Sequence, residues 1–184
     1  MDESKASRKT KELKELPDLI GPNPILVFVG FNASIHAATT GHYYSRPANR
    51  FWPLLRECGL IPPHFTHEND RDFPSLGLGL IDLVKRPSNA AHEVTKEEFR
   101  EGAIRVRGIL EAAGPKAVCC VGKGVFEFLC GHRGGDWGLQ ADRLGRSAVY
   151  MMPSTSGRAN RLDGERRRVL GELKTLVDAF GRTM

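Results

Sequence analysis

Short apolar runs alternate with longer segments of helical periodicity along most of this chain. The apolar runs span residues 25–29, 78–84, 117–121 and 147–152. Their length and their content of β-branched residues are typical of buried parallel strands. Between them, apolar residues recur at helical spacing, most clearly over 95–112 and 163–180. This alternation predicts a single-domain α/β fold, a three-layer sandwich with a mostly parallel four- to five-stranded sheet flanked by helices.

Capping and turn residues place the ends of several of these elements. Asn49 is expected to cap a helix that runs to about residue 58. Thr95 and Glu98 have the spacing of a capping box, and Gly114 is expected to stop the helix that they open. The glycine-rich segment 131–145 reads as a loop or a hairpin.

The length of 184 residues fits one domain with a sizeable core. Residues 1–16 are charged and contain few apolar side chains, which predicts a flexible N-terminal tail ahead of a domain over 17–184. The formal charge is +5, with 27 Lys and Arg against 22 Asp and Glu. This excess favours a polyanionic partner without requiring one. Five of the arginines crowd one stretch near the C-terminus: Arg158, Arg161, Arg166, Arg167 and Arg168.

The cysteines and histidines do not form a recognisable metal motif. None of the four cysteines belongs to a CxxC pair, and the adjacent Cys119 and Cys120 are expected to point to opposite faces of a strand. We therefore expect reduced thiols. His64 and His67 have HxxH spacing but no evident third ligand, so no metal is expected. No apolar run is long enough to span a membrane and no signal-peptide core is evident, which predicts a soluble, cytoplasmic protein.

Polar residues stand at the ends of three of the predicted strands. Asn32 lies two positions after Gly30, which is expected to end the first strand, and the segment 154–158 follows the last strand. Asp82 lies in the second apolar run, where an unpaired carboxylate would be costly to bury. Open α/β sheets bind ligands at the carboxyl ends of their strands, so Asn32 and Asp82 are expected to face one crevice. Alternatively, the strand ends near Ile81 and Asp82 caps the following turn.

The segment after Gly30 has the composition of a ligand-binding loop. It contains small residues, which let the backbone approach a ligand closely: Ala33, Ser34, Ala37, Ala38 and Gly41. Either Tyr43 or Tyr44 offers an aromatic ring that can stack on a flat ligand. From this pattern alone, an ordinary strand-loop-helix connection remains an equal alternative.

Two segments in combination resemble a known family. The first joins Gly30-Phe31-Asn32 to the stretch GHYYSRPANRFW at 41–52, and the second is MPSTS at 152–156 with Arg158. In this order and at this spacing, the chain resembles the mismatch-specific uracil/thymine DNA glycosylases of the uracil-DNA glycosylase superfamily. The resemblance covers nearly all of residues 25–180. It implies that duplex DNA containing uracil or a mismatched pyrimidine is gripped across the strand ends by a monomer, without a metal or organic cofactor.

The resemblance also implies roles for individual residues. Asn32 falls on the family's asparagine that positions the attacking water, and Tyr44 falls where an aromatic ring stacks on the flipped base. The pocket for the base would be formed by Gly30, Phe31, Ala33, Ser34, Ala37, Tyr44 and Asn49. The loop that enters the duplex and fills the vacated space would be Ser154, Thr155, Ser156, Gly157 and Arg158. Arg158 has the alternative role of one more cation on a basic surface.

The chain departs from the family pattern at two places. The family's usual first motif is Gly-Ile-Asn-Pro-Gly, whereas Ala33 and Ser34 follow Asn32 here. Asp82 stands where familiar members carry a non-acidic residue. A carboxylate can activate water or stabilise an oxocarbenium ion, so we hypothesise that Asp82 shares catalysis with Asn32.

The function predicted from these residues is monofunctional excision of uracil, or of other pyrimidines opposite guanine, that leaves an abasic site. No lysine occupies the catalytic loops, so strand cleavage is not expected. One rival is a non-catalytic DNA lesion-binding module on the same fold. Another is a small-molecule hydrolase that uses Ser34 or Ser154, but neither serine lies in a GxSxG motif.

Overall fold

The computed structural model describes residues 13–180, except for the side chains of Ala91, Arg158, Ala159 and Asn160. Most of the expected N-terminal tail, residues 1–12, lies outside this range. Within the range, Leu16 is 4% exposed and packs in the core. The packed part of the chain therefore includes the last residue of the segment that we expected to be a tail.

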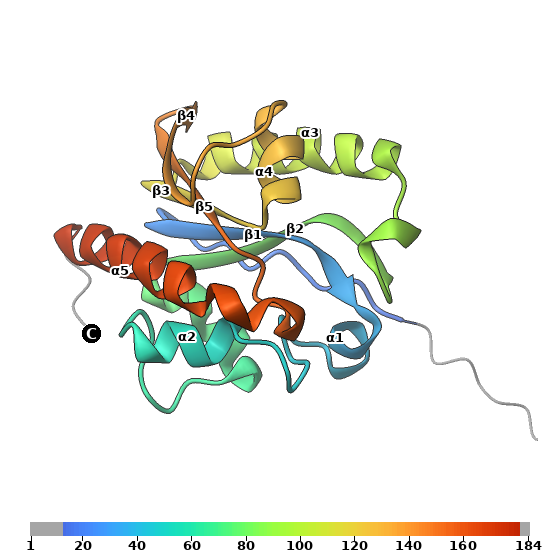
Figure 1. Ribbon diagram of the computed structural model, residues 1–184, viewed down its shortest axis with the longest axis horizontal. Helices are drawn as coiled ribbons and strands as arrows, with labels where there is room; N and C mark the ends of the chain where they lie inside the picture. Colours follow the sequence, from blue (N-terminus) through green and yellow to red (C-terminus); the bar gives the residue numbers. More distant parts are fainter. Residues whose placement is uncertain (1–12, 181–184) are drawn as a thin grey trace, which may run out of the picture.

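A five-stranded sheet in the order β2-β1-β3-β5-β4 forms the centre of the fold (Figure 1). The strands are β1 (Leu26–Ser34), β2 (Leu78–Ser88), β3 (Ala117–Val121), β4 (Gly138–Leu144) and β5 (Ser147–Met152). β2, β1, β3 and β5 run parallel, and β4 is antiparallel to β5. The predicted mostly parallel sheet is confirmed, and the segment 131–145 contributes one strand of a hairpin.

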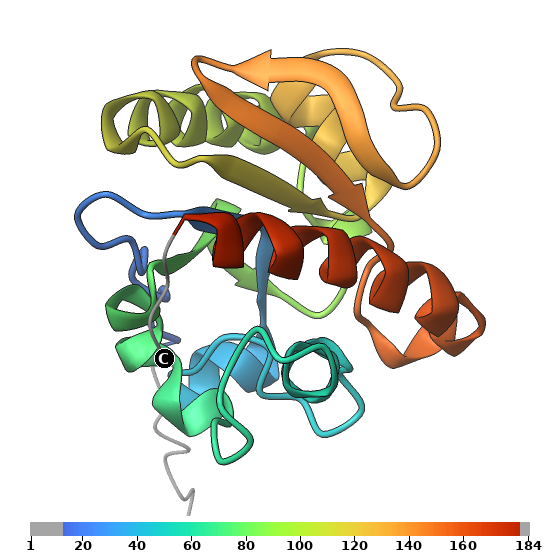
Figure 2. The ribbon, with the colours of Figure 1, turned by 90° about the vertical axis from the view of Figure 1, so that its left-hand side faces the viewer.

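Helices cover both faces of this sheet (Figures 1 and 2). α3 and α4 lie on one face, and α1, α2 and α5 lie on the other, as Figure 1 shows. The α-helices are α1 (Ile35–Thr40), α2 (Phe51–Glu57), α3 (Lys96–Ala113), α4 (Lys123–Cys130) and α5 (Asp163–Ala179). The 3₁₀ helices are η1 (His67–Leu76), η2 (Ala91–Glu93) and η3 (Gly157–Leu162). In the described part of the chain, no helix combines the length and hydrophobicity needed to cross a membrane.

The caps of α3 form where the sequence places them, whereas the N-cap of α2 is Arg50, one residue after the predicted Asn49. Thr95 Oγ accepts from the Glu98 amide at 3.1 Å, and the Glu98 carboxylate accepts from the Thr95 amide at 2.8 Å, which completes the capping box of α3. Gly114 ends α3 with φ +58°, a left-handed conformation that glycine adopts without strain. Asn49 Oδ1 accepts from the Phe51 amide at 2.9 Å, so it satisfies a free N–H at the start of α2.

Two strands are longer than the sequence predicts. β1 does not end at Gly30 but continues to Ser34, because Asn32 and Ser34 still pair with β2. β2 likewise passes Ile81 and reaches Ser88, so Asp82 lies inside a strand and not in a turn. The pairing of β1 with β3, in contrast, stops at Val29. β1 therefore leaves β3 at Gly30 while it stays attached to β2. The short helix α1, which follows β1 directly, was not predicted.

Strand alternation sorts the side chains of β1 between two hydrophobic cores. Leu26 and Phe28 pack in the core that contains residues of α2 and α5, whereas Val27 and Val29 pack in the core that contains residues of α3 and α4. The same alternation turns position 30 toward the α2 and α5 layer, and Phe31 packs against the α3 and α4 core. The sheet thus presents the residues after Val29 to two different layers.

Candidate active site

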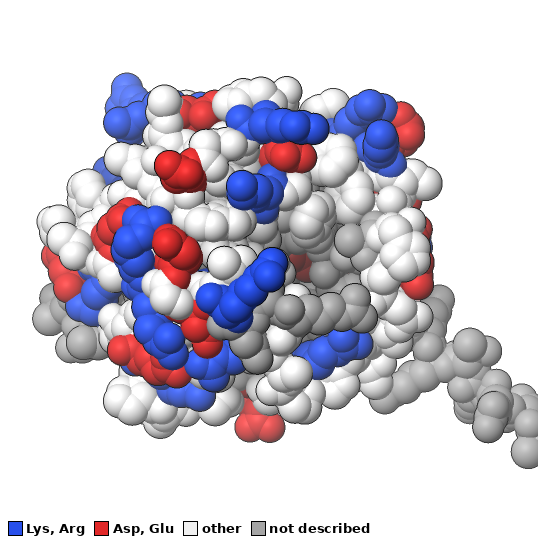
Figure 3. All heavy atoms as spheres, viewed as in Figure 1, with Lys and Arg blue, Asp and Glu red and all other residues white. Residues whose placement is uncertain are grey.

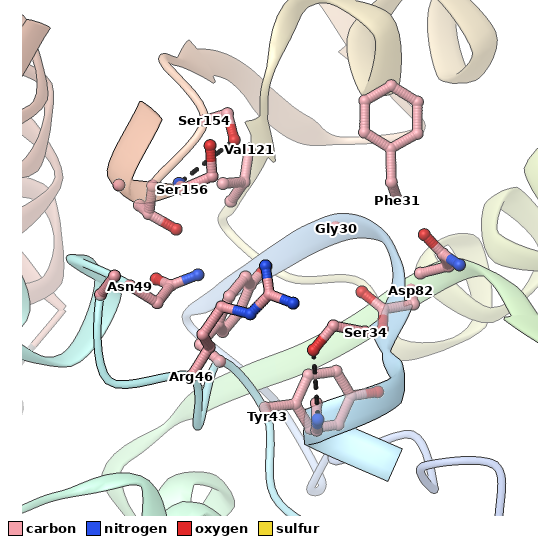
Figure 4. A pocket seen from close by; sticks show the side chains of 16 residues that line it. Gly30, Phe31, Ser34, Tyr43, Arg46, Asn49, Asp82, Val121, Ser154 and Ser156 are labelled. Carbon is pink, nitrogen blue, oxygen red and sulfur yellow. Dashed lines mark hydrogen bonds between the residues drawn. The ribbon is translucent and has the colours of Figure 1, made fainter. Parts of the chain in front are cut away.

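A cavity of about 300 Å³ opens beside Gly30, where β1 leaves β3 (Figure 4). In open α/β sheets, the carboxyl ends of strands that diverge around a change in strand order form the ligand site. Residues from separate parts of the chain line it: Gly30, Phe31, Asn32, Ser34, Ala37, Tyr43, Tyr44, Arg46, Ala48, Asn49, Asp82, Val121, Ser154, Thr155, Ser156 and Gly157. β1, β2, the turn before α2 and the segment after β5 therefore meet at one place.

The carboxyl group of Asp82 lies against Gly30. The two residues are register partners in the β1–β2 pair. A Cβ atom at Gly30 would lie 2.3 Å from Asp82 Oδ1 and 2.7 Å from the Tyr44 hydroxyl oxygen. Glycine is therefore required at position 30 if both groups are to keep their places. Asp82 is 5% exposed, and its carboxyl oxygens accept no hydrogen bond from the described residues.

Burial raises the pKa of the Asp82 carboxyl to about 7. The charges of Lys85 and Arg105 lower this pKa, and the charge of Asp18 raises it, each less than burial does. These groups bind one another, since Lys85 donates to Asp18 and Arg105 donates to Asp18 at 2.7 Å. Arg105 also donates to the backbone carbonyl of Asp82. A carboxyl group with this pKa is well placed to accept a proton near neutral pH.

The side chain of Asn32 is fixed by β2. Its Nδ2 donates to the Arg86 carbonyl at 3.1 Å and to Ser88 Oγ at 2.8 Å. The described residues give its Oδ1 no partner, so this atom can accept a hydrogen bond from a water in the cavity. The extension of β2 to Ser88 thus orients the asparagine.

The ring of Tyr44 has one face covered. It stacks on Phe51 with ring centroids 4.1 Å apart and an angle of 21° between the planes. Tyr44 lines the cavity, so its opposite face is the one available to a flat ligand. Burial, and then the charge of Asp82, hold the pKa of the Tyr44 phenol well above its usual value. The phenol therefore stays protonated and can donate a hydrogen bond.

A buried carboxylate holds the turn that carries Tyr44. Asp70 is fully buried, and it accepts from the Tyr43 amide at 2.9 Å and contacts His42 Nδ1 at 2.9 Å. The Trp52 indole donates to the Tyr43 carbonyl at 2.8 Å. Tyr44 itself has φ +52°, which is uncommon for a residue other than glycine and requires such support.

Arg166 of α5 holds the segment after β5. Its side chain is fully buried and donates to the carbonyl oxygens of Ser154 and Ser156, and it pairs with Asp163. Among the described residues, its Nε is the only buried side-chain nitrogen or oxygen without a partner. The buried guanidinium binds the backbone carbonyls of Ser154 and Ser156, whereas the side chains of these two serines are exposed on the outer surface.

The same segment is joined to the turn before α2. The Arg50 amide donates to the Thr155 carbonyl at 2.9 Å, and Arg50 Nε donates to Asp163 at 3.2 Å. A Cβ atom at Gly157 would lie 2.8 Å from the carbonyl oxygen of Ala48. Only glycine allows this close approach. The two walls of the cavity are therefore locked together before any ligand binds.

Most of the residues predicted for the site line this cavity. The three exceptions are Phe31, Ala33 and Arg158. Phe31 borders the cavity, but its ring points away toward α3 and α4, where a Cβ atom at Gly124 would lie 2.4 Å from Phe31 Cζ (Figure 4). Ala33 does not line the cavity and is buried in the core, because β1 continues through it. The backbone of Arg158 lies in η3, and its side chain is outside the described part of the chain.

The sequence did not point to Arg46, Ala48 and Val121, which also line the cavity, and it offered Tyr43 only as an alternative to Tyr44 for stacking. Arg46 and Ala48 lie between Tyr44 and Asn49, so their position within the motif was the available signal. Tyr43 is 3% exposed, and its hydroxyl donates to the Pro17 carbonyl at 3.2 Å. Its role is therefore largely structural.

The arginines near the C-terminus are mostly compensated by acidic residues. Arg167 donates to Glu57 at 3.0 Å, Arg168 donates to Glu172 at 2.6 Å, and Arg166 is buried. Figure 3 shows Lys and Arg interleaved with Asp and Glu over α5. Arg166, Arg167 and Arg168 therefore do not form a surface of uncompensated positive charge.

Metal ligation has no support within residues 13–180, where no group of three His, Cys, Asp or Glu side chains could hold an ion. His42 is tied to Asp70, and its ring lies 5.9 Å from that of His67. The cysteines are free thiols, and burial raises the pKa of Cys130 to about 11. The described polar side chains at the cavity carry amide, carboxyl, phenol, hydroxyl and guanidinium groups.

Comparison with known proteins agrees with this arrangement. The family model described as the uracil DNA glycosylase superfamily matches residues 17–174. A G/U mismatch-specific uracil DNA glycosylase from Schizosaccharomyces pombe is 32% identical over 171 residues, which cover 88% of this chain and 53% of that protein. The chain thus spans about half the length of this relative.

A solved structure shares the fold. It is an NMR structure from Methanosarcina acetivorans, provisionally named a uracil DNA glycosylase, with a TM-score of 0.57 and 18% identity. The match covers 88% of this chain and 98% of that chain. At this identity, the likeness concerns the arrangement of the sheet and helices.

Proposed function

The chain belongs to the uracil DNA glycosylase superfamily, and from that membership we propose that it is a monofunctional DNA glycosylase. It flips uracil out of duplex DNA, notably uracil opposite guanine, and hydrolyses the N-glycosidic bond. The product is an abasic site for base excision repair. Thymine and other damaged pyrimidines opposite guanine belong to the same proposed substrate class. The protein acts as a monomer inside the cell.

The observation that carries this proposal is the meeting of Asn32, Asp82 and Tyr44 around one cavity. The volume of about 300 Å³ is at the small end of ligand pockets, as a site for a single base requires. Stacking of the flipped base on the free face of Tyr44 would return roughly 1–3 kcal/mol of the cost of flipping. The phenol beside Asp82 can donate to a base carbonyl.

Hydrolysis follows from the two polar groups next to Gly30. Asn32 Oδ1 accepts from a water and orients its oxygen toward the sugar carbon. As the bond from that carbon to the base breaks, its electron pair leaves with the base, and the cationic sugar is stabilised by the Asp82 carboxylate. The water oxygen then bonds to the carbon, and its proton passes to Asp82. Asp82 therefore acts as proton acceptor and as counter-ion in the same event.

The segment Ser154–Gly157 with Arg158 is proposed to enter the duplex and occupy the space that the base vacates. The contacts of Arg166 and Arg50 with this segment support a preformed loop, because they hold its carbonyl groups without DNA. Arg158→Ala is expected to weaken excision from duplex more than from single strands. Equal losses on both substrates would indicate that Arg158 acts only as one more cation on a basic surface.

The experiment is a single-turnover assay on an end-labelled duplex with one uracil opposite guanine. We expect free uracil and a strand that breaks only after alkali, as a monofunctional enzyme leaves it. Asn32→Ala and Asp82→Asn should lose this activity, and Arg146→Ala, at the turn between β4 and β5, should keep it. Binding of the duplex without release of uracil would contradict catalysis and support the lesion-binding alternative.

A further inference from the structure

The cavity has a cationic side chain that the predicted site did not include. Of the described residues that line it, Arg46 is the only Lys or Arg. Arg46 is exposed, and its guanidinium has no hydrogen bond or ion pair with the described residues. In Figure 4 it projects between Asn49 on one side and Ser34 and Asp82 on the other. An unpaired cation at this place is available to a ligand.

Neighbouring arginines do not share this property. Arg50, four positions further on, pairs with Asp163 at 3.2 Å and with Glu57 at 3.3 Å. Arg167 also pairs with Glu57, at 2.9 Å. The guanidinium groups of Arg50 and Arg167 are neutralised within the fold, so of these three arginines Arg46 is the one that is free to bind an anion.

The backbone of Arg46 is fixed, so its side chain starts from a defined point. The Asn49 amide donates to the Arg46 carbonyl at 2.8 Å and closes a turn. The buried Ser45 is hydrogen-bonded to Thr40 at 2.7 Å. Ala48, two positions after Arg46, is in contact with Gly157. Arg46 thus faces the segment 154–157 across the same opening, from a wall that is already in place.

The position suits a phosphate better than a base. Asp82 is 5% exposed, whereas Arg46 is exposed, so the cation stands at the mouth and the acid stands inside. A nucleotide whose base enters the cavity leaves its sugar and phosphates at that mouth. Guanidinium groups bind phosphate oxygens through two parallel hydrogen bonds. We propose that Arg46 binds a phosphate next to the flipped nucleotide and so fixes its sugar over Asn32 and Asp82.

This inference rests on the proposed function, and its effect is measurable apart from catalysis. Each phosphate contact lowers the slope of log K against log salt by about 0.9 in duplex DNA. Arg46→Ala should therefore bind more weakly and show a slope smaller by about one such contact. Arg46→Lys keeps the charge and should keep the slope, with part of the affinity lost. In turnover, the loss should fall on the half-saturating DNA concentration more than on the maximal rate.

The matched control is Arg146→Ala. Arg146 is exposed and lies in the turn before β5, at the end of the sheet opposite the cavity. The described residues give its side chain no partner either. It should bind DNA with the wild-type slope, because it removes the same charge from a place that the flipped nucleotide does not reach.

The measurement is fluorescence anisotropy over a salt series, with a duplex that carries 2′-fluoro-2′-deoxyuridine opposite guanine and resists hydrolysis. An Arg46→Ala slope equal to those of the wild type and Arg146→Ala would overturn the inference. An unchanged slope with a slower single-turnover rate at saturating DNA would also overturn it and assign Arg46 to the base. Failure of the wild type to release uracil would defeat the proposed function alone, because the slopes would still decide the role of Arg46. No binding by the wild type would defeat both.

Discussion

Asp82 and Gly30 fill a single space, since a Cβ atom at Gly30 would lie 2.3 Å from Asp82 Oδ1. β2 can therefore carry an aspartate at position 82 only because residue 30 of β1 has no side chain. The Tyr44 hydroxyl uses the same gap, because it would lie 2.7 Å from that Cβ atom. The three residues form one unit in which the smallest member makes room for the other two.

Gly30→Ala should disable this unit without unfolding the protein. The added methyl group must displace Asp82 or Tyr44, and a shift of about 1 Å at a reacting group costs about 10²-fold in rate. Single-turnover release of uracil measures the loss. The control is Gly108→Ala in α3, where a Cβ atom has no neighbour within 4 Å. That variant should keep its rate and gain about 0.5–1 kcal/mol of stability. A Gly30→Ala enzyme with the wild-type rate would contradict the arrangement of the three residues.

The rate of excision should depend on the ionisation of Asp82. Its pKa of about 7 means that the carboxylate form is lost below neutral pH. The single-turnover rate should rise with pH up to about 7 and then level off, as expected of a proton acceptor. Asp82→Asn should lower the plateau by about 10²–10⁴-fold and remove the rise. Full activity of Asp82→Asn, together with loss of activity in Asn32→Ala, would rule out the proposed role of Asp82.

The same carboxyl group should make the protein less stable at higher pH. Its pKa is raised from 3.8 to about 7, so between these values the folded state binds more protons than the unfolded state. The free energy of unfolding must then fall as pH rises from about 4 to about 7. Below this range, the contribution of Asp82 to stability is fully present. Asp82→Asn does not bury a carboxylate charge, so its free energy of unfolding above neutral pH should exceed that of the wild type by ~2–4 kcal/mol. Urea unfolding at acid and alkaline pH measures the difference, and an equal offset at both values would contradict it.

Tyr44 should contribute by its ring and by its hydroxyl separately. Tyr44→Leu removes the stacking surface and should weaken binding of the flipped base by roughly 1–3 kcal/mol. Tyr44→Phe keeps the ring on Phe51 and should preserve most of that binding, while it loses the donor beside Asp82. Binding of a hydrolysis-resistant duplex separates the two effects. A loss of equal size in both variants would show that stacking is not the main contribution of Tyr44 to binding of the flipped base.

Arg166 should matter more for duplex than for single-stranded substrate. Arg166→Met keeps a long buried side chain but frees the carbonyl groups of Ser154 and Ser156, so the loop that enters the duplex loses its support. We expect excision from duplex to fall by about tenfold or more, and excision from single strands to fall less. Asp163→Asn, which weakens one partner of Arg166, should show a smaller effect in the same direction. Equal losses on both substrates would indicate a general folding defect.

The sequence predicted the elements well where the signal is local. The four apolar runs became strands, and the capping box of Thr95 and Glu98 opens α3 as expected. The length of β1 was not predictable in the same way. Residues 31–34 are extended because β2 offers them partners up to Ser88, which is a tertiary effect that overrides the break expected at Gly30.

The candidate site shows the same division. The motif residues Asn32 and Tyr44 line one cavity with Asp82, as the family resemblance implied for the first two. Arg46 and Arg166 were less visible, because nothing in the local sequence tells an unpaired arginine from a paired or a buried one. The burial of Arg166 depends on the backbone carbonyls of Ser154 and Ser156, and Glu57 and Asp163 pair with Arg50 and not with Arg46.

The ring of Phe31 over Gly124 carries a consequence for how this protein can change. The two residues share one volume on the α3 and α4 side of the sheet, so a larger residue at Gly124 collides with the ring, and a smaller one at Phe31 leaves a void. Homologous chains should therefore vary at these two positions as a pair. Grafting the family's Gly-Ile-Asn-Pro-Gly motif onto this scaffold would need a matching change at Gly124, and either exchange made alone should be selected against.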